Sequence, residues 1–183
     1  MLSTARALPP STDDVLKHLI RSIPDFPIPG INFKDITPLL ADPQGFQSAI
    51  DKACSQISGL PVDVVVAIES RGFVLGAPIA ARVSAGLILV RKPGKLPGEK
   101  DRFPYSCEYC DGVLEVHRGS IQPGMRCLVV DDLLATGGTA RATADYIASV
   151  GAEVSGFSFL IELAALGGRS LLQSAPVYSV LVY

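Results

Sequence analysis

The chain has 183 residues, of which 48% are hydrophobic and 19% charged, and its formal net charge is −2. This composition argues against a disordered chain, and the small net charge provides no global basic field for binding nucleic acid. No apolar run approaches the roughly 18 residues of a membrane span, no secretory signal is visible, and four cysteines are too few for a disulfide scaffold, so we expect one soluble cytoplasmic domain over residues 1–183.

The N-terminal part contains two predicted helices separated by an irregular loop. Residues 11–23 have the apolar spacing of an amphipathic helix behind a polar cap at Ser11, and Pro24 ends this helix. Residues 24–35 carry three prolines and a glycine, which predicts an ordered but irregular loop. A second amphipathic helix begins at about Asp42, with Pro43 in its first turn.

Beyond residue 60 the pattern changes to short buried strands that alternate with helices or loops. Continuous apolar runs are typical of strands that are covered on both faces, as in a parallel sheet. The predicted strands are 62–68, 87–90, 127–130 and 154–160, and the predicted helices are 72–83 and 139–150. The fold class is therefore α/β, with a doubly wound, mostly parallel sheet flanked by helices.

Residues 93–112 interrupt this alternation. They are rich in proline, glycine and charged residues and have no clear periodicity. Long irregular segments in compact domains are often functional, so we expect a flexible catalytic lid here.

The segment VVDDLLATGGT, residues 129–139, combines an apolar strand, two acids and a glycine-rich loop that leads into a helix. Ligands of open α/β sheets bind beyond the carboxyl ends of the strands, where a helix N-terminus favours phosphate. Carboxylates accept hydrogen bonds from sugar hydroxyls, and threonine hydroxyls and loop amides donate to phosphate, so the pattern indicates a phosphorylated sugar. The residues predicted to bind this sugar phosphate are Asp131, Asp132, Ala135, Thr136, Gly137, Gly138 and Thr139.

The motif supports one prediction about the backbone and excludes two other nucleotide-binding motifs. Because side chains alternate along a strand, both acids converge only if the chain leaves the sheet there, and we predict that it does. Neither a dinucleotide fingerprint nor a nucleotide-triphosphatase phosphate loop occurs in the sequence. A plain strand-to-helix turn with surface carboxylates is the alternative reading of the diglycine alone.

VVDDLLATGGT closely resembles the signature of the type I phosphoribosyltransferases. The resemblance covers nearly the whole chain and is closest to the adenine phosphoribosyltransferases, through PDFPIPGINFKDITPLL, ESRGF, RKPGKLPG and the Glu108-Tyr109 pair. It implies a purine-salvage enzyme that transfers the 5-phosphoribosyl group of 5-phosphoribosyl 1-diphosphate to adenine and forms AMP and diphosphate. It also implies a homodimer and Mg²⁺ held mainly by substrate oxygens and water, without a protein metal cage.

The resemblance also assigns residues to the diphosphate. Arg71 follows a predicted strand and is implied as a catalytic residue beside the substrate-binding Ser70, and family members often have a non-proline cis peptide at the position of Glu69-Ser70. Arg91, Lys92 and the catalytic Lys95 neutralise the phosphates. Judged alone, Arg71 could be a solvated surface arginine, and Lys100 and Arg102 are read as solvated lid residues.

The adenine site is implied by four matched positions and by the lid. An aromatic and an aliphatic side chain, Phe33 and Leu163, sandwich the base, while backbone groups near Asn32 and Lys34 read its edge. This makes residues 1–40 a small N-terminal hood over the base site. On the lid, Glu108 is the implied catalytic proton acceptor and Tyr109 a substrate contact. Judged singly, Phe33 and Leu163 are more often core residues, and Glu108 could be a solvated glutamate.

Two other functions fit parts of the sequence. Cys107-x-x-Cys110 has the spacing of a redox-active thiol pair or of half a zinc site, but no second cysteine pair supports zinc. A non-catalytic regulator that senses phosphoribosyl diphosphate would retain VVDDLLATGGT and lose the base pocket or the lid. Matches to both are present, which favours catalysis.

Overall fold

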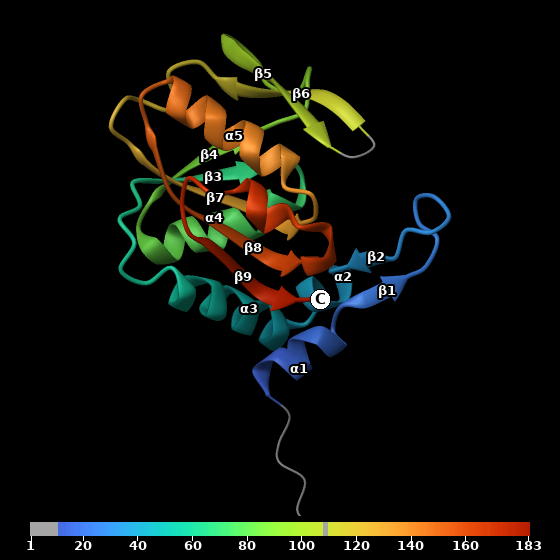
Figure 1. Ribbon diagram of the computed structural model, residues 1–183. Helices are drawn as coiled ribbons and strands as arrows, with labels where there is room; N and C mark the ends of the chain where they lie inside the picture. The colour runs from blue at the N-terminus through green and yellow to red at the C-terminus, as the bar shows by residue number, and fades with distance from the viewer. Residues whose placement is uncertain (1–10, 108–109) are drawn as a thin grey trace, which may run out of the picture. The chain divides into compact units, whose positions relative to one another are not determined.

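The computed structural model describes residues 11–107 and 110–183 (Figure 1). The chain divides into two compact units, residues 1–49 and residues 50–183. A single domain with a base-site hood over residues 1–40 stays a prediction.

The first unit begins with a helix and a short hairpin. Helix α1, Thr12–His18, starts at a capping box in which the Ser11 hydroxyl accepts a hydrogen bond from the Asp14 amide at 3.2 Å. Strand β1, Arg21–Ile23, then pairs antiparallel with strand β2, Phe33–Asp35. The predicted helix over residues 11–23 was therefore too long. Its last residues pair with a distant strand, and Arg21 forms an ion pair across the hairpin with Asp35 at 2.5 Å.

Two further helices follow β2. Helix α2, Thr37–Ala41, was not predicted, and it begins where the Asp35 carboxylate accepts the Thr37 amide at 2.9 Å. Helix α3, Pro43–Gln56, starts where the sequence indicated and runs across the division between the two units.

The second unit is built on a five-stranded sheet in the order β4-β3-β7-β8-β9, and every neighbouring pair is parallel (Figure 1). This confirms the α/β class with a parallel central sheet, although β9 was not predicted. The strands are β3 Val64–Ile68, β4 Gly86–Val90, β7 Arg126–Leu134, β8 Glu153–Glu162 and β9 Val177–Val182, and the helices are α4 Arg71–Val83 and α5 Gly138–Ser149.

Helices α4 and α5 cover opposite faces of this sheet. A Cβ atom added at Gly76 of α4 would lie closest to Ala67 and Val65 of β3. Ile147 of α5, in contrast, shares a buried cluster with Val64 and Val66. Since successive side chains of a strand point to opposite faces, β3 is buried on both sides, which explains its continuous apolar run.

The predicted irregular lid is largely a β-hairpin. Strands β5, Lys100–Cys107, and β6, Cys110–His117, form a separate two-stranded antiparallel sheet. Phe103 and Leu114 are buried in the core of the second unit. Two 3₁₀ turns, η1 Ala164–Leu166 and η2 Gly168–Leu171, connect β8 to β9.

Candidate active site

A cavity of about 270 Å³ lies at the carboxyl ends of β3 and β7, where a parallel sheet is expected to bind its ligand. It brings together residues predicted for the diphosphate with residues predicted for the sugar. The lining residues are Ile68, Glu69, Ser70, Arg71, Lys92, Tyr105, Leu114, Asp131, Asp132 and Thr139.

Both predicted acids line this cavity, but the chain does not leave the sheet at their position. Strand β7 stays paired with β8 as far as Leu134, so that prediction was wrong. The pairing of β7 with β3 ends at Val130 instead. Beyond that residue the start of α4 lies against β7 in place of β3, and both carboxylates line the same cavity.

The electrostatics of the two acids differ. The Asp132 carboxylate is buried and accepts a hydrogen bond from Nε of Arg71 at 2.5 Å. Desolvation and the adjacent charge of Asp132 raise the pKa of Asp131 well above its ordinary range. The site therefore holds one carboxylate that is paired with Arg71 and one that is costly to ionise.

Gly72, in the first turn of α4, allows this helix to start directly against the acids. A Cβ atom at Gly72 would lie 2.8 Å from the carbonyl oxygen of Val130 and 3.0 Å from Oδ1 of Asp131. Any larger residue would push Arg71 away from the carboxylates, which explains the glycine in ESRGF.

The loop after β7 forms a second cavity of about 120 Å³, which is lined by Asp131 and the whole ATGGT segment, residues 135–139. Gly137 has φ +86° and precedes α5, whose N-terminus has no side-chain cap. An uncapped helix N-terminus presents backbone N–H groups and a positive dipole end to an anion. The geometry of the predicted sugar-phosphate loop therefore suits a phosphate group.

The predicted basic residues gather around a buried acid. The Glu69 carboxylate accepts hydrogen bonds from Nζ of Lys95 at 2.9 Å, Nε of Arg91 at 3.1 Å and the amide of Lys92 at 3.0 Å. Desolvation raises the pKa of Glu69, but these hydrogen bonds outweigh it and leave the pKa below its ordinary value. The Glu69-Ser70 peptide bond is cis, as the resemblance implied.

Comparison with known proteins decides the family. The family model described as "Phosphoribosyl transferase domain" matches residues 39–180. The chain belongs to the phosphoribosyltransferase family. Among curated relatives, an adenine phosphoribosyltransferase of Sorangium cellulosum is 54% identical over 90% of this chain and 85% of the relative.

Solved structures support the same family assignment. The adenine phosphoribosyltransferase of Thermoanaerobacter pseudethanolicus is 44% identical, with a TM-score of 0.89 over 92% of this chain and 98% of the other. That of Saccharomyces cerevisiae, solved with adenine and an imino-altritol bisphosphate, is 36% identical, with a TM-score of 0.85 over 93% and 98% of the two chains. The resemblance to adenine phosphoribosyltransferases is confirmed, and this phosphoribosyltransferase is an enzyme of that type.

A second buried glutamate, Glu115, was not predicted to matter. It is fully buried in β6, accepts the amide of Gly94 at 3.0 Å and Nε of Arg102 at 2.9 Å, and lies 3.6 Å from Nζ of Lys100. Lys100 and Arg102 are therefore not simply solvated, as the sequence suggested. Leu114 and Val116 on either side of Glu115 are also buried, and nothing in the sequence identified the partners of Glu115.

The residues predicted to bind the base fall into three groups. In the second unit, Leu163 is half-buried and its amide donates to the carbonyl of Leu134, immediately before the phosphate loop, at 2.9 Å. In the first unit, Asn32 is exposed, Phe33 packs edge-on against Phe26 at 5.2 Å, and Nζ of Lys34 donates to the Ser22 hydroxyl. Glu108 and Tyr109 lie outside the described residues.

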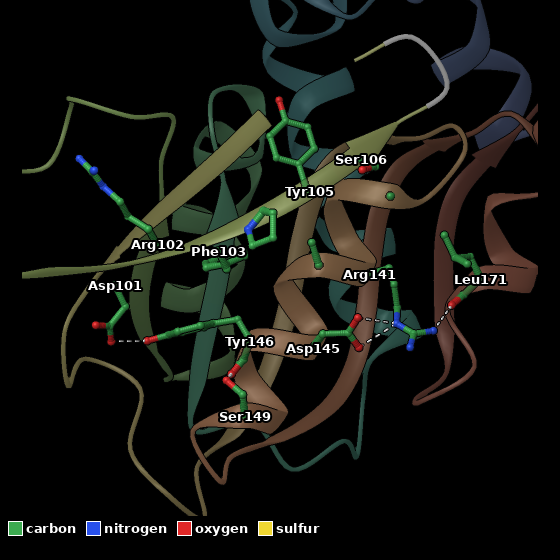
Figure 2. Close-up of a pocket in the computed structure, with 13 residues that line it drawn as sticks. Asp101, Arg102, Phe103, Tyr105, Ser106, Arg141, Asp145, Tyr146, Ser149 and Leu171 are labelled. Carbon is green, nitrogen blue, oxygen red and sulfur yellow. Dashed lines mark hydrogen bonds and ion pairs between the residues drawn. The ribbon is translucent and has the colours of Figure 1, made fainter. Parts of the chain in front are cut away.

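A larger groove, of about 750 Å³, is lined by residues of β5 and α5 (Figure 2). The Tyr146 hydroxyl donates to Asp101 at 2.9 Å, and its ring stacks on Phe103 at 4.7 Å. Along α5, Arg141 is paired with Asp145, four positions further on (Figure 2). The groove residues thus fasten the hairpin of this phosphoribosyltransferase to the helix that follows its phosphate loop.

The thiol hypothesis stays a prediction. Cys107 and Cys110 are register partners at the end of the hairpin, and their side chains lie outside the described structure. Cys54 and Cys127 are free, and desolvation raises the pKa of Cys127 to about 11. Within residues 11–107 and 110–183 there is no cluster of three or more metal-ligating side chains, nor any helix long and apolar enough to cross a membrane.

Proposed function

We propose that this site transfers the 5-phosphoribosyl group of 5-phosphoribosyl 1-diphosphate to adenine and forms AMP and diphosphate, in purine salvage. One observation carries the proposal. Two carboxylates, an uncapped helix N-terminus and a set of basic groups meet along the carboxyl edge of one sheet. These are the partners that ribose hydroxyls, a 5-phosphate and a diphosphate each require.

The substrate extends along this edge. Residues 135–139 bind the 5-phosphate through their amides and the hydroxyls of Thr136 and Thr139. Asp131 and Asp132 accept the ribose hydroxyls and place negative charge near the sugar ring, which becomes cationic as the diphosphate departs. Arg71, bonded to Asp132, links the sugar subsite to the diphosphate subsite.

The diphosphate leaves towards Ser70, Arg71 and the loop of Arg91, Lys92 and Lys95. Ser70 and Lys92 line the same cavity as the acids. Of these groups, Arg71 and Lys95 are the proposed catalytic cations, because they stabilise the charge that accumulates on the leaving group.

For adenine we keep the residues that the resemblance implies, with Phe33 and Leu163 on the faces of the base and the backbone near Asn32 and Lys34 at its edge. The hydrogen bond that the Leu163 amide donates to the Leu134 carbonyl supports this assignment, since it fixes Leu163 to the start of the phosphate loop. Glu108 accepts the proton that the attacking ring nitrogen loses, with Tyr109 beside it on the lid.

Mg²⁺ fits the donor set of the site as a substrate-borne ion. The cavity offers the carboxylates of Asp131 and Asp132, but Asp132 is already paired with Arg71. Mg²⁺ usually keeps several waters and is held through one or two carboxylates and substrate phosphates. When bound, it would neutralise phosphate charge, while the residues of the chain orient the sugar.

The enzyme acts as a cytoplasmic homodimer. Val74 and Leu87 are exposed large apolar residues on α4 and on the edge strand β4, and Ala77 and Ala81 are exposed on the same helix. An apolar surface beside a sheet edge suits a self-complementary contact. Free thiols at Cys54 and Cys127 suit a reducing compartment.

The test is a base panel. Purified protein with Mg²⁺ and 5-phosphoribosyl 1-diphosphate is offered adenine, hypoxanthine, guanine or orotate, and nucleotide products are separated by chromatography. We expect AMP from adenine at least about 100-fold faster than product from the other bases, since mispaired polar edges are rejected strongly. Product from another base but not from adenine would overturn the base assignment. Binding of the activated sugar without any product would indicate a regulator.

A further inference from the structure

The Glu69 carboxylate occupies an unusual place for an acid, inside the basic part of the site. Its side chain is only 5% exposed. Its backbone is fixed at the end of β3, where the Glu69 amide donates to the carbonyl of Val90 in β4 at 2.9 Å. An ionised carboxylate buried to this extent persists only with strong partners.

Glu69 finds those partners in the loop after β4. Oε2 accepts Nε of Arg91 and the amide of Lys92, and Oε1 accepts Nζ of Lys95. One rigid strand end therefore fixes the two charged side chains and the backbone between them. Both cations are otherwise long, rotamer-rich side chains that would lose entropy on binding a ligand.

These bonds align the cations without using all their donors. Arg91 donates through Nε to Glu69 and through Nη1 to the carbonyl of Lys95, and among the described residues no acceptor is recorded for its Nη2. The guanidinium also lies over the ring of Phe73, 5.7 Å from its centroid. Lys95 donates one of its three ammonium hydrogens to Glu69. Donors remain for an incoming anion.

We propose that Glu69 is a positioning residue that arranges Arg91 and Lys95 in advance for the diphosphate of the substrate. This inference rests on the proposed function, which assigns the diphosphate to that loop. Arranging the donors before binding lowers the ordering cost of each substrate encounter. The benefit must exceed the repulsion between Glu69 and the phosphates, which the neighbouring cations screen.

The opposite role makes an opposite prediction. If Glu69 acted only as a negative charge near the phosphates, its neutralisation would strengthen the binding of diphosphate. If it positions the cations, neutralisation weakens that binding, because Arg91 and Lys95 lose their common acceptor. The sign of the change therefore separates the two roles.

The test compares Glu69→Gln, which keeps the size of the side chain, with the wild type. Calorimetry measures the Kd for inorganic diphosphate, and initial rates give KM for each substrate. We expect the diphosphate Kd and the KM for the activated sugar to rise about tenfold, as for loss of charge-assisted hydrogen bonds, with little change in the KM for adenine. Unchanged or tighter diphosphate binding would overturn the proposal.

Asp63→Asn is the matched control. Asp63 also binds an arginine, with Oδ1 2.6 Å from Nη2 of Arg126, but it precedes β3 and so lies at the opposite edge of the sheet. We expect it to leave diphosphate binding unchanged. If Glu69→Gln does not fold, Glu69→Asp retains the charge on a shorter side chain, and a smaller loss of the same kind is expected. An unchanged diphosphate Kd in that variant would contradict the proposal.

Calorimetry also separates this inference from the proposed function, because diphosphate binding requires no turnover. A wild type that binds diphosphate but makes no AMP, with binding weakened in Glu69→Gln, would overturn the function and keep the positioning role. If the wild type forms AMP normally and Glu69→Gln leaves the diphosphate Kd and the KM for the activated sugar unaltered, the positioning role is overturned and the proposed function is kept.

Discussion

Asp131 and Asp132 are adjacent in sequence and line one cavity, and Nε of Arg71 forms an ion pair with the Asp132 carboxylate. The amide of Asp132 donates to Oδ1 of Asp131 at 2.8 Å, and this hydrogen bond fixes the Asp131 carboxylate. Desolvation and the charge of Asp132 raise the pKa of Asp131, so its ionisation is costly, and such a group at a ligand site is a frequent form of the trade-off between stability and activity. We therefore expect Asp131 to lower the stability of the folded protein while it serves ribose binding.

Asp131→Asn tests this expectation. The pKa of Asp131 is raised in the folded protein, so the folded state binds the proton more tightly than the unfolded state. Stability is therefore lost as the pH rises through the interval between the unfolded and the folded pKa. Asparagine carries no charge and keeps Oδ1 as an acceptor for the Asp132 amide.

We expect Asp131→Asn to have a higher Tm than the wild type at pH 7, with the difference shrinking towards pH 4. The kcat/KM should fall about 100-fold, as when a group that stabilises transition-state charge is lost. Thermal unfolding followed by circular dichroism between pH 4 and pH 8 measures the first effect. A variant less stable than the wild type at pH 7 would contradict the account.

At the scale of elements, the sequence predicted the parts whose burial is determined by their neighbours in the parallel sheet. Strand β3 and helices α3, α4 and α5 lie close to their predicted ranges, because long apolar runs and helical periodicity dominate there. The elements that were missed depend on distant pairing. The hairpin β5–β6 contains Pro104 and the charged run Lys100 to Arg102, and β1 forms only by pairing with β2.

The functional site likewise contains residues that could be predicted from the sequence and residues that could not. The acids and the phosphate loop could be predicted because strand, acids and diglycine are contiguous in VVDDLLATGGT. Glu69 and Glu115 could not, since the partners of Glu69 lie 22 or more positions away, and Gly94 lies 21 positions from Glu115. Burial of a carboxylate against distant cations leaves no periodic signal in a sequence.

The 3₁₀ turn η2, Gly168–Leu171, supports the phosphate loop from outside. A Cβ atom at Gly137 would lie 2.8 Å from the carbonyl oxygen of Gly168, and one at Gly168 would collide with the carbonyl of Ala135. Arg169, next in the chain, binds the buried Glu162 at the end of β8. This ion pair holds the glycine against the loop.

Gly168→Ala should therefore disturb the phosphate loop without touching substrate. We expect a KM for the activated sugar raised about tenfold or more and a stability loss of about 1–3 kcal/mol from overpacking. Gly86→Ala is the control, since its Cβ would have no neighbour closer than 3.6 Å. Initial rates and chemical denaturation measure both effects. Normal KM in Gly168→Ala would show that the loop does not depend on this contact.

At the scale of the whole molecule, the proposed dimer surface contains Val74 and Leu87. Val74→Asp introduces a charge that a self-complementary apolar contact would bury twice, which is costly without a partner. We expect sedimentation velocity at micromolar concentration to change from a dimer to a monomer, with a loss of activity. Val182→Asp, at another exposed valine on β9, should leave the dimer intact. A wild type that sediments as a monomer would contradict the proposal.

The central claim is that the carboxyl edge of the sheet binds a phosphorylated ribose with its base. A crystal structure of the protein with AMP tests this most directly. The account predicts the 5-phosphate on the amides of residues 135–139, the ribose hydroxyls on Asp131 and Asp132, and adenine against Leu163. AMP bound elsewhere, or bound here with its phosphate away from residues 135–139, would contradict it.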